Sequence, residues 1–305
     1  MTSRRAIGID LGGTTLNAGL VDEAGVIEHF IQEPCRVAEN AEAPLIAIES
    51  VVRRLRELAG ASVVAAGLGL PGVIDPEHGA LVGSTPHLPH WRDFPIRDCL
   101  APRLGLPLVV DNDANLAAFG EYRCGAARGA RLAIMVTVGT GVGCGIVADG
   151  KILRGAFGGA GELGHLPIGH GEVECRCGVP NCIEPEMSGS GLVRQAAHEG
   201  LAARNASELF AAASGGDVAA TRLVDAMTDR LALTLSVAIN LLNPDVVVMG
   251  GGVMNVGEPL LARLRAGVRH YALKSHRSDL KLVASALGER SGVAGAGLLA
   301  LEASR

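Results

Sequence analysis

The chain has 305 residues, 42 of them glycine; 19% are charged, 3% are aromatic, and the formal net charge is −5. This length can hold one large domain or two ordinary ones, and the composition favours an α/β protein with many tight turns over a disordered or fibrous chain. The negative charge excludes a broad basic surface for nucleic acid or anionic lipid. Neither a signal peptide nor a bilayer-spanning apolar run is recognisable, so we expect a soluble, cytoplasmic protein.

The first part of the chain begins with three short apolar segments separated by turns. They predict an antiparallel meander of three strands, at 6–10, 17–21 and 26–32. The apolar period then becomes helical over 44–58. A continuous apolar run at 63–70 predicts a buried parallel strand. The following predicted elements are a helix at 96–104, a strand at 107–111 and a helix at 115–122.

The same order of elements then starts again. The predicted strands are 132–138, 142–148, 151–153, 245–249 and 280–285, and the predicted helices are 189–199, 206–213, 217–242, 258–268 and 292–303. One order of elements therefore occurs twice, with insertions: three strands, a helix, a strand, a helix and a strand. This repetition indicates an internal duplication of element order. We expect an N-terminal α/β domain over 1–118 and a C-terminal α/β domain over 119–289, with the last helix, about 290–305, packing back on the first. Two such halves leave a cleft suited to a ligand.

Two glycine- and threonine-rich turns hold matching places in the two halves. The first contains Asp10, Gly12, Gly13, Thr14 and Thr15, and the second contains Thr137, Gly139, Thr140 and Gly141. Glycines let backbone amides approach an anion, and threonine hydroxyls can donate to it. The pair predicts phosphate binding, with Asp10 placed to hold magnesium through water. A third turn, Gly250, Gly251 and Gly252, is either a nucleotide contact or a plain strand-to-helix turn.

The segment 111–115, with sequence DNDAN, follows a buried strand and opens a helix. One Asp or Asn would be enough to cap that helix, but the segment has four such residues. A carboxylate here can accept the proton of a substrate hydroxyl while an amide side chain orients the substrate. We therefore interpret the segment as a catalytic turn.

The segment 158–184 carries three of the seven cysteines. His165, Cys175, Cys177 and Cys182 supply one nitrogen and three thiolates, the donor set of a closed, structural zinc site. In a cytoplasmic protein a Cys-x-Cys cluster favours a metal over a disulfide. We interpret the segment as a zinc-pinned insert that holds Glu162 and Glu184 rigidly as acceptors for the hydroxyls of a neutral polyol.

These pieces together resemble the ROK family (repressor, open reading frame, kinase) of the actin-like ATPase superfamily, and the resemblance covers nearly the whole chain. The segments that carry it are IGIDLGGTTLNAGLVD at the start, GLGLPGVID at 67–75, DNDAN at 111–115, TVGTGVGCGI at 137–146, GGAGELGH at 158–165 and CRCGVPNCIE at 175–184. The resemblance implies a ribonuclease H-like fold of two α/β domains hinged about a central cleft for sugar and ATP.

The resemblance also implies a role for each matching residue. Asp113 would be the catalytic base in the transfer of the γ-phosphoryl group of ATP to a sugar hydroxyl. The residues implied to bind the sugar are Gly72, Asn112, Asp113, Glu162, His165 and Glu184, with His165 also a zinc ligand. The first two glycine turns would hold phosphates and Mg²⁺, and Gly250–Gly252 would face the adenosine.

Three residues depart from the family pattern. Thr15 stands where Lys is frequent, which removes a cation near the phosphates. Asn181 stands where Gly is usual before the last cysteine; because Asn tolerates a left-handed backbone, we expect the metal loop to survive. Asp111 stands where Glu is frequent, and the sequence offers no interpretation of that change.

The resulting prediction is an ATP-dependent hexokinase that makes glucose 6-phosphate. The alternatives are a kinase of another hexose or N-acetylhexosamine (N-acetylmannosamine, N-acetylglucosamine, fructose) and a non-catalytic sugar-sensing regulator. Repressors of the family carry a DNA-binding motif ahead of the first strand, and Asp10 leaves little room for one. A homodimer or homotetramer is implied by the resemblance. Loss of Cys177 is expected to weaken sugar binding or to unfold the metal loop, without affecting the phosphate turns.

Overall fold

The computed structural model describes residues 4–59, 62–171 and 173–305. Its chain divides into two compact units: unit 1 comprises 1–129, 145–160 and 286–305, and unit 2 comprises 130–144 and 161–285. Because these units are groups of contacting residues, the domain boundary predicted at 118/119 stays a prediction. The α/β fold class predicted from the sequence is confirmed.

The sheet of unit 1 has the strand order β3-β2-β1-β4-β7. Its strands are β1 (Arg5–Leu11), β2 (Thr15–Asp22), β3 (Ile27–Pro34), β4 (Val63–Leu70) and β7 (Leu108–Asn112). The first three pair antiparallel, which confirms the predicted meander, whereas β4 pairs parallel to β1 and β7 parallel to β4. A small hairpin of β5 (Val73–Asp75) and β6 (Ala80–Val82) was not predicted, because three-residue strands show no period.

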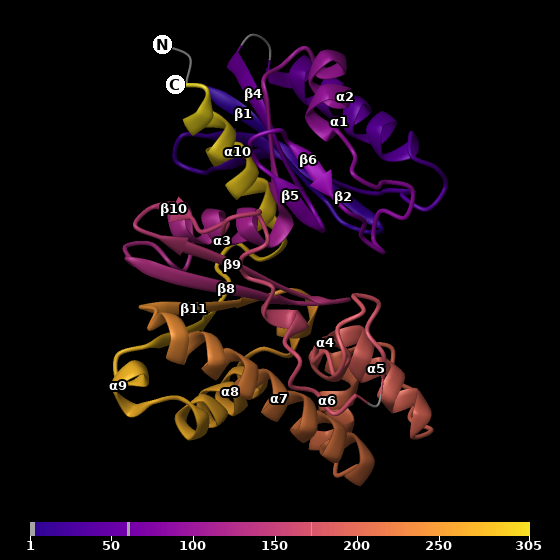
Figure 1. Cartoon of the computed structure of the whole chain (residues 1–305), viewed down its shortest axis with the longest axis vertical. Helices are drawn as coiled ribbons and strands as arrows, with labels where there is room; N and C mark the ends of the chain where they lie inside the picture. The colour runs from indigo at the N-terminus through magenta and orange to yellow at the C-terminus, as the bar shows by residue number, and fades with distance from the viewer. Residues whose placement is uncertain (1–3, 60–61, 172) are drawn as a thin grey trace. The chain divides into compact units, whose positions relative to one another are not determined.

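Four α-helices belong to unit 1: α1 (Ala43–Ala59), α2 (Ile96–Leu104), α3 (Asp113–Cys124) and α10 (Ser291–Ala303), the last preceded by the 3-10 turn η4 (Gly288–Arg290). The final helix α10, yellow in Figure 1, packs along β1 and β4, although almost 300 residues separate Arg4 from the hydroxyl of Ser304 to which its guanidinium donates. Helix α10 thus lies on two strands of the unit 1 sheet.

The two faces of the unit 1 sheet are buried under different helices. Ile7 and Ile9 of β1 belong to the large apolar cluster that includes Ile48 of α1, whereas Ala6 clusters with Leu301 of α10. Alternate residues of one strand thus enter different cores. This explains why β1 and β4 read as continuous apolar runs rather than alternating ones.

Close packing of α10 requires glycine in the strands below it. A Cβ at Gly8 would lie 2.0 Å from the carbonyl oxygen of Val293, and one at Gly67 would lie 2.0 Å from that of Ala296. Neither position leaves room for a methyl group against helix backbone. Small residues in β1 and β4 therefore set the distance between the sheet and α10.

The second sheet has the order β10-β9-β8-β11-β12. Its strands are β8 (Leu132–Val138), β9 (Val142–Ala148), β10 (Lys151–Ile152), β11 (Val246–Gly250) and β12 (Lys281–Ala284). This strand order corresponds to that of the first sheet. The three strands β8, β9 and β10, consecutive in the chain, take the places of β1, β2 and β3, and β11 and β12, which pair in parallel on the other side of β8, take the places of β4 and β7. The duplication predicted from the element order is therefore present in the sheet topology. Residues 145–160, which include the end of β9 and all of β10, group with unit 1.

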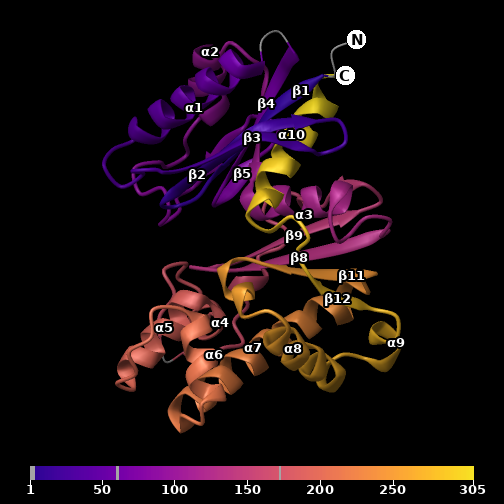
Figure 2. The same ribbon diagram turned by 180° about the vertical axis from the view of Figure 1, so that it is seen from behind.

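The helices of unit 2 cover its part of this sheet. They are α4 (Glu184–Met187), α5 (Gly189–His198), α6 (Ala206–Ser214), α7 (Val218–Leu242), α8 (Glu258–Tyr271) and α9 (Lys274–Arg277), with 3-10 turns η2 (Leu163–His165) and η3 (Gly252–Val256). The longest, α7, begins at the cap Asp217, whose side chain accepts from the amide of Ala220, and it runs beside α8 (Figure 2). Among the described residues, none of these helices is both long and apolar enough to cross a membrane.

The contact between α10 and β4 predicts the outcome of a single methyl insertion. Gly67→Ala should lower the free energy of unfolding by about 2 kcal/mol or more, because the new methyl group meets backbone that cannot turn aside. Denaturant unfolding measures the change. The matched control is Gly215→Ala at the end of α6, where φ is −77° and the nearest atom to a new Cβ is 3.3 Å away. Equal stability of the two variants would contradict the packing argument.

Candidate active site and metal centre

Three parallel strands of unit 1 end at one level. Asp10 of β1 pairs with Gly69 of β4, and Gly69 pairs with Asp111 of β7. Neighbouring strands lie about 4.8 Å apart, and Gly69 brings no side chain into the space between the two acidic strand ends. The register thus brings together Asp10 and the DNDAN segment, which the sequence presents as separate motifs.

Asn112 and Asp113 open helix α3. Asn112 is the N-cap: its Oδ1 accepts from the amide of Asn115 at 3.1 Å, and its Nδ2 donates to the carbonyl oxygen of Gly72 at 3.1 Å. An amide side chain has two N–H donors and two acceptor lone pairs, so one of each remains for a ligand. The capping and the substrate-binding interpretations of this segment are therefore compatible. Gly72 meets Asn112 through its backbone.

The carboxylates of Asp10 and Asp113 influence each other. Burial and the negative charge of Asp113 raise the pKa of Asp10 from 3.8 to about 7, against a hydrogen bond from Asn17. Burial likewise raises the pKa of Asp113, while the amide of Ala114 and the charge of His87 lower it. A carboxylate with a raised pKa is a better proton acceptor near neutral pH.

Asp10 and its neighbour Asn17 fit the magnesium ion that the family implies. Asn17 faces Asp10 across the β1–β2 pair, and its buried Oδ1 has no hydrogen-bond partner in the described part of the chain. Mg²⁺ usually keeps several waters and takes one or two carboxylates. A hydrated ion at Asp10 would compensate the carboxylate charge, and one of its waters could donate to Asn17 Oδ1.

The first glycine turn joins β1 to β2. The amide of Gly12 donates to the carbonyl oxygen of Thr15 at 2.8 Å, and Thr14 at the tip is exposed. His87 lies against this turn, since a Cβ at Gly13 would be 3.1 Å from its Nδ1. The sequence analysis did not select His87. Its position next to a phosphate turn and its effect on Asp113 both depend on tertiary packing, so sequence spacing offered no signal for it.

The second glycine turn joins β8 to β9 in the same way. The amide of Gly139 donates to the carbonyl oxygen of Gly141 at 2.9 Å, and Thr140 at the tip is exposed. The start of α5 is attached here: the amide of Gly189 donates to Gly139, and Ser190 Oγ donates to the carbonyl oxygen of Thr140 at 2.5 Å.

The third glycine turn lies beside the second. Gly250 pairs with Thr137 in the parallel β8–β11 register. Gly251 has φ of 82°, and a Cβ there would lie 2.4 Å from the carbonyl oxygen of Val138, whereas Gly252 is exposed with open space around it. The second and third glycine turns thus lie side by side, and both interpretations of the third turn left open by the sequence stay predictions.

Glu162 and His165 belong to a short turn laid on β9. The 3-10 turn η2 approaches the strand so closely that a Cβ at Gly161 would lie 2.4 Å from Cys144 O, and one at Gly164 would lie 2.5 Å from Val142 O. His165 Nε2 is 3.8 Å from a carboxylate oxygen of Glu162. The glycines of this segment thus fix the height of both side chains above β9.

The four predicted zinc ligands lie together: the ligand atoms of His165, Cys175, Cys177 and Cys182 are within 4.8 Å of one another. His165 Nδ1 is 3.4 Å from Cys182 Sγ and 3.9 Å from Cys175 Sγ. A tetrahedral ion with Zn–N of about 2.0 Å and Zn–S of about 2.3 Å sets nitrogen and sulfur about 3.5 Å apart. Burial raises the pKa of the thiols of Cys175 and Cys182. A cation at the centre would offset this cost of ionisation, so the donor set fits zinc.

Glu184 connects the cysteine cluster to the second glycine turn. Its Oε1 is 3.4 Å from Cys175 Sγ, and its Oε2 accepts from the amide of Val142 at 3.1 Å. A Cβ at Gly141 would lie 2.7 Å from the same Oε2. One carboxylate thus contacts both the cysteine cluster and the second glycine turn. The expectation that loss of Cys177 leaves the glycine turns unaffected stays a prediction, and this contact is the route by which it could fail.

Asn181 adopts the backbone expected for the glycine it replaces. Its φ is 53°, and its carbonyl oxygen accepts from the amide of Gly169 at 2.8 Å. Asn is among the residues that tolerate this left-handed region. The metal loop therefore keeps its path despite the departure from the family pattern.

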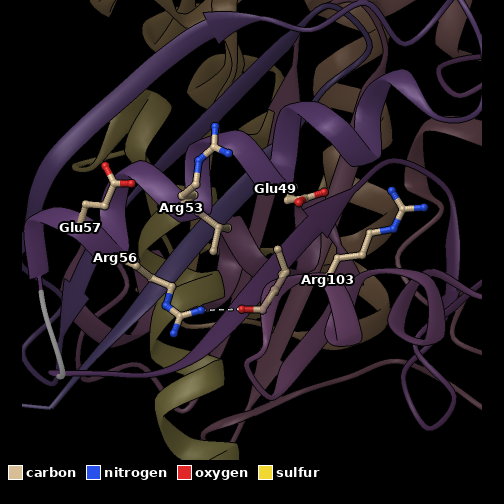
Figure 3. Close-up of a pocket in the computed structure, with 7 residues that line it drawn as sticks. Glu49, Arg53, Arg56, Glu57 and Arg103 are labelled. Carbon is tan, nitrogen blue, oxygen red and sulfur yellow. Dashed lines mark hydrogen bonds between the residues drawn. The ribbon is translucent and has the colours of Figure 1, made fainter.

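A depression of about 520 Å³ between α1 and α2 holds none of the predicted site residues (Figure 3). Two of its guanidinium groups are engaged: Arg56 donates to the carbonyl oxygen of Leu104 at 2.7 Å, and Arg103 pairs with Glu42. Glu49 and Glu57 supply negative charge to the same walls. Because its lining includes none of the residues predicted to bind sugar, nucleotide or metal, we assign it no function.

Comparison with known proteins agrees with these observations. A model of the ROK family matches residues 6–303. The chain belongs to the ROK family. This ROK protein is 35% identical to a glucokinase of Halalkalibacterium halodurans, over 98% of the chain and 96% of the relative.

Two solved structures resemble this ROK protein over nearly their full length. A ROK hexokinase from Thermus thermophilus has a TM-score of 0.86 and 35% identity, covering 98% of each chain. A ROK family glucokinase from Streptomyces griseus in complex with glucose and AMPPNP has a TM-score of 0.85 and 34% identity, covering 98% of this chain and 99% of that one. The predicted actin-like ATPase fold is thereby confirmed.

The raised pKa of Asp10 predicts how stability depends on pH without added Mg²⁺. The folded pKa lies above the unfolded one, so the stability associated with the protonated group is lost as pH rises from about 4 to about 7. Asp10→Asn does not titrate. Its melting temperature relative to the wild type should therefore increase between pH 5 and pH 8, as measured by thermal unfolding.

The exposed Asp279 provides the control for this experiment, because Asp279→Asn also removes one carboxylate. Its melting temperature relative to the wild type should stay nearly constant over the same range. If the difference in melting temperature between Asp10→Asn and the wild type were also constant over this range, the raised pKa of the buried Asp10 carboxyl would be contradicted.

Proposed function

We propose that this protein is an ATP-dependent hexokinase that converts glucose to glucose 6-phosphate. The observation that carries the proposal is the interaction of two carboxylates whose pKa values are raised by burial: Asp113 at the start of α3, and Asp10 on β1, which β4 separates from β7. One group serves as base and the other holds the metal of the nucleotide. The named activities of the similar glucokinases and the glucose complex of one of them support glucose as the acceptor.

Unit 1 supplies the groups that act on the reacting hydroxyl. Asp113 accepts the proton of the sugar hydroxyl as its oxygen bonds to the γ-phosphorus, while the bond from that phosphorus to the β-bridging oxygen breaks and ADP leaves. The free donor and acceptor of Asn112 orient the sugar. Since phosphoryl transfer needs mainly positioning and charge compensation, one base and well-placed amides suffice.

Unit 2 supplies the groups for the sugar ring. Glu162, His165 and Glu184 accept or donate at ring hydroxyls, held at a fixed height by the zinc loop and by η2. The specificity for glucose over another hexose or an N-acetylhexosamine depends on contacts to the C2 substituent. These other sugars stay the alternative acceptors.

The nucleotide is held by the glycine turns. The amides and hydroxyls around Thr14 and Thr140 bind phosphate oxygens, and Gly250–Gly252 lies against the adenosine. Mg²⁺ bound through water at Asp10 would supply positive charge to the β- and γ-phosphates. We propose ATP as the donor because the structural relative binds AMPPNP.

Zinc at the cluster is structural in this proposal. His165, Cys175, Cys177 and Cys182 would supply all four ligands of a tetrahedral ion, which would leave no open position for chemistry. The cytoplasmic location and a homodimer or homotetramer stay predictions.

Sugar-dependent ADP release tests the proposed reaction directly. With ATP and Mg²⁺, glucose should stimulate release above every other sugar in a panel of hexoses and N-acetylhexosamines. Preference for another sugar would replace glucose by an alternative acceptor. Lack of stimulation by any sugar, together with sugar binding, would favour the non-catalytic regulator.

Substitution of the base separates chemistry from binding. Asp113→Asn should reduce kcat by about 100- to 10,000-fold, the usual contribution of a general base. The amide keeps the shape of the side chain, so glucose affinity by calorimetry should change little. Turnover close to the wild-type value would remove Asp113 from the role of base.

Loss of one zinc ligand tests the connection through Glu184. Cys177→Ser should remove most of the bound zinc and raise KM for the sugar by about tenfold or more. Because Glu184 also accepts from Val142, KM for ATP should rise too. Cys99→Ser, outside the cluster, is the control and should alter neither value. An unchanged KM for ATP in the zinc-depleted variant would show that the turn keeps its shape without the insert.

A further inference from the structure

We propose that Arg154 is a positioning residue for the phosphoryl transfer, acting through Asp111 on the turn that carries Asp113. The inference rests on the proposed kinase activity. It concerns two residues to which neither the sequence motifs nor the mechanism above assigns a role.

Asp111 is a buried carboxylate with a dedicated counter-ion. Its exposed fraction is 2%, and its Oδ2 accepts from Arg154 Nε at 2.7 Å and lies 2.6 Å from Arg154 Nη2. Both guanidinium nitrogens reach the same oxygen, so Arg154 compensates the charge of Asp111 and holds the position of Oδ2, while Oδ1 has donors of its own. Asp111 is therefore held in one rotamer.

The other oxygen of this carboxylate holds the catalytic turn. Oδ1 accepts from the backbone amide of Asn112 at 2.8 Å and from Asn115 Nδ2 at 3.0 Å. These two donors lie on either side of Asp113 in the chain. One carboxylate oxygen of Asp111 thus contacts Arg154, and the other contacts the first turn of α3. A change in the position of Oδ2 would therefore also move the backbone that carries Asp113.

Arg154 is itself anchored in unit 1. Its carbonyl oxygen accepts from the amide of Ala160 at 3.0 Å, which closes a loop after β10. That loop packs on β5, since a Cβ at Gly158 would lie 2.2 Å from Ile74 O. The guanidinium therefore projects from a braced segment rather than from a mobile tail.

Removal of Arg154 would leave a buried carboxylate without its counter-charge. Such a group either takes up a proton or turns toward water, because an unpaired buried charge is strongly unfavourable. Either change alters the bonds from Oδ1 to Asn112 and Asn115. Asp113 would then lose the fixed position from which it accepts the hydroxyl proton.

Steady-state kinetics of matched variants test this role. Arg154→Gln removes the fork, Arg154→Lys keeps the charge, and Asp111→Asn removes the buried carboxylate. The double variant R154Q/D111N removes both partners. Arg54→Gln is the control, because Arg54 also pairs with a carboxylate of unit 1, Glu33 at 2.8 Å, but on the surface. Each kcat is divided by the folded fraction from thermal unfolding.

We expect R154Q to lower kcat per folded molecule by about 10- to 100-fold, the effect of a misplaced reacting group, with KM for ATP within about twofold of wild type. R154K should recover part of the loss. The double variant should be no slower than the slower single variant, because the two residues act as a unit. If R154Q does not fold, R154K and the double variant still report this coupling.

The contrary outcomes are distinct. Equal kcat per folded molecule for R154Q and R54Q would overturn the role of Arg154, and so would multiplicative losses in the double variant. A lower yield of folded protein with unchanged kcat would assign the pair to stability alone. An inactive wild type would instead overturn the kinase and the inference together, so the two failures are distinguishable.

Discussion

The parallel register of β1, β4 and β7 is the constraint on which the chemistry of unit 1 depends. It sets Asp10, Gly69 and Asp111 level at the ends of three neighbouring strands. A slip of one residue along a strand would reverse the direction of its side chains and separate the two acidic groups. The register in turn requires α10 to lie close on β1 and β4, which small strand residues permit. The site thus rests on packing between the two ends of the chain.

Unit 2 applies the same topology to a different purpose. The β8–β11 register sets Thr137 beside Gly250, as the β1–β4 register sets Asp10 beside Gly69. Here the strand ends carry glycine turns with open backbone instead of paired carboxylates. The insert that leaves after β10 returns to this turn through Glu184, so one carboxylate joins the cysteine cluster to the second glycine turn.

The departures from the family pattern become interpretable in the folded chain. Asn181 keeps the left-handed backbone that the metal loop needs, and Asp111 is matched to an arginine fork at hydrogen-bonding distance. Thr15 leaves the first turn without the frequent lysine, yet the imidazole of His87 lies against Gly13 of that turn. Each departure therefore has a local partner.

The sequence by itself determined most of the fold and the identity of the chemical groups. Apolar residues that recur at every second position, or at helical spacing, predicted nearly every long strand and helix. They do so because an element that buries one face must place its apolar side chains at the period of that element. The four metal ligands followed from residue type and spacing. The three-residue strands β5 and β6 and the short helix α4 escaped prediction, since so few residues carry no period.

Only the tertiary structure decided how these groups interact. The ion pair of Asp111 with Arg154, the approach of His87 to Gly13 and the double contact of Glu184 join residues that are distant in sequence and share no motif. Their proximity results from strand register and close glycine packing, which depend on the summed contacts of the whole fold. A linear pattern identifies the residue types available for chemistry, whereas the raised pKa values of Asp10 and Asp113 arise only when burial removes water from around them.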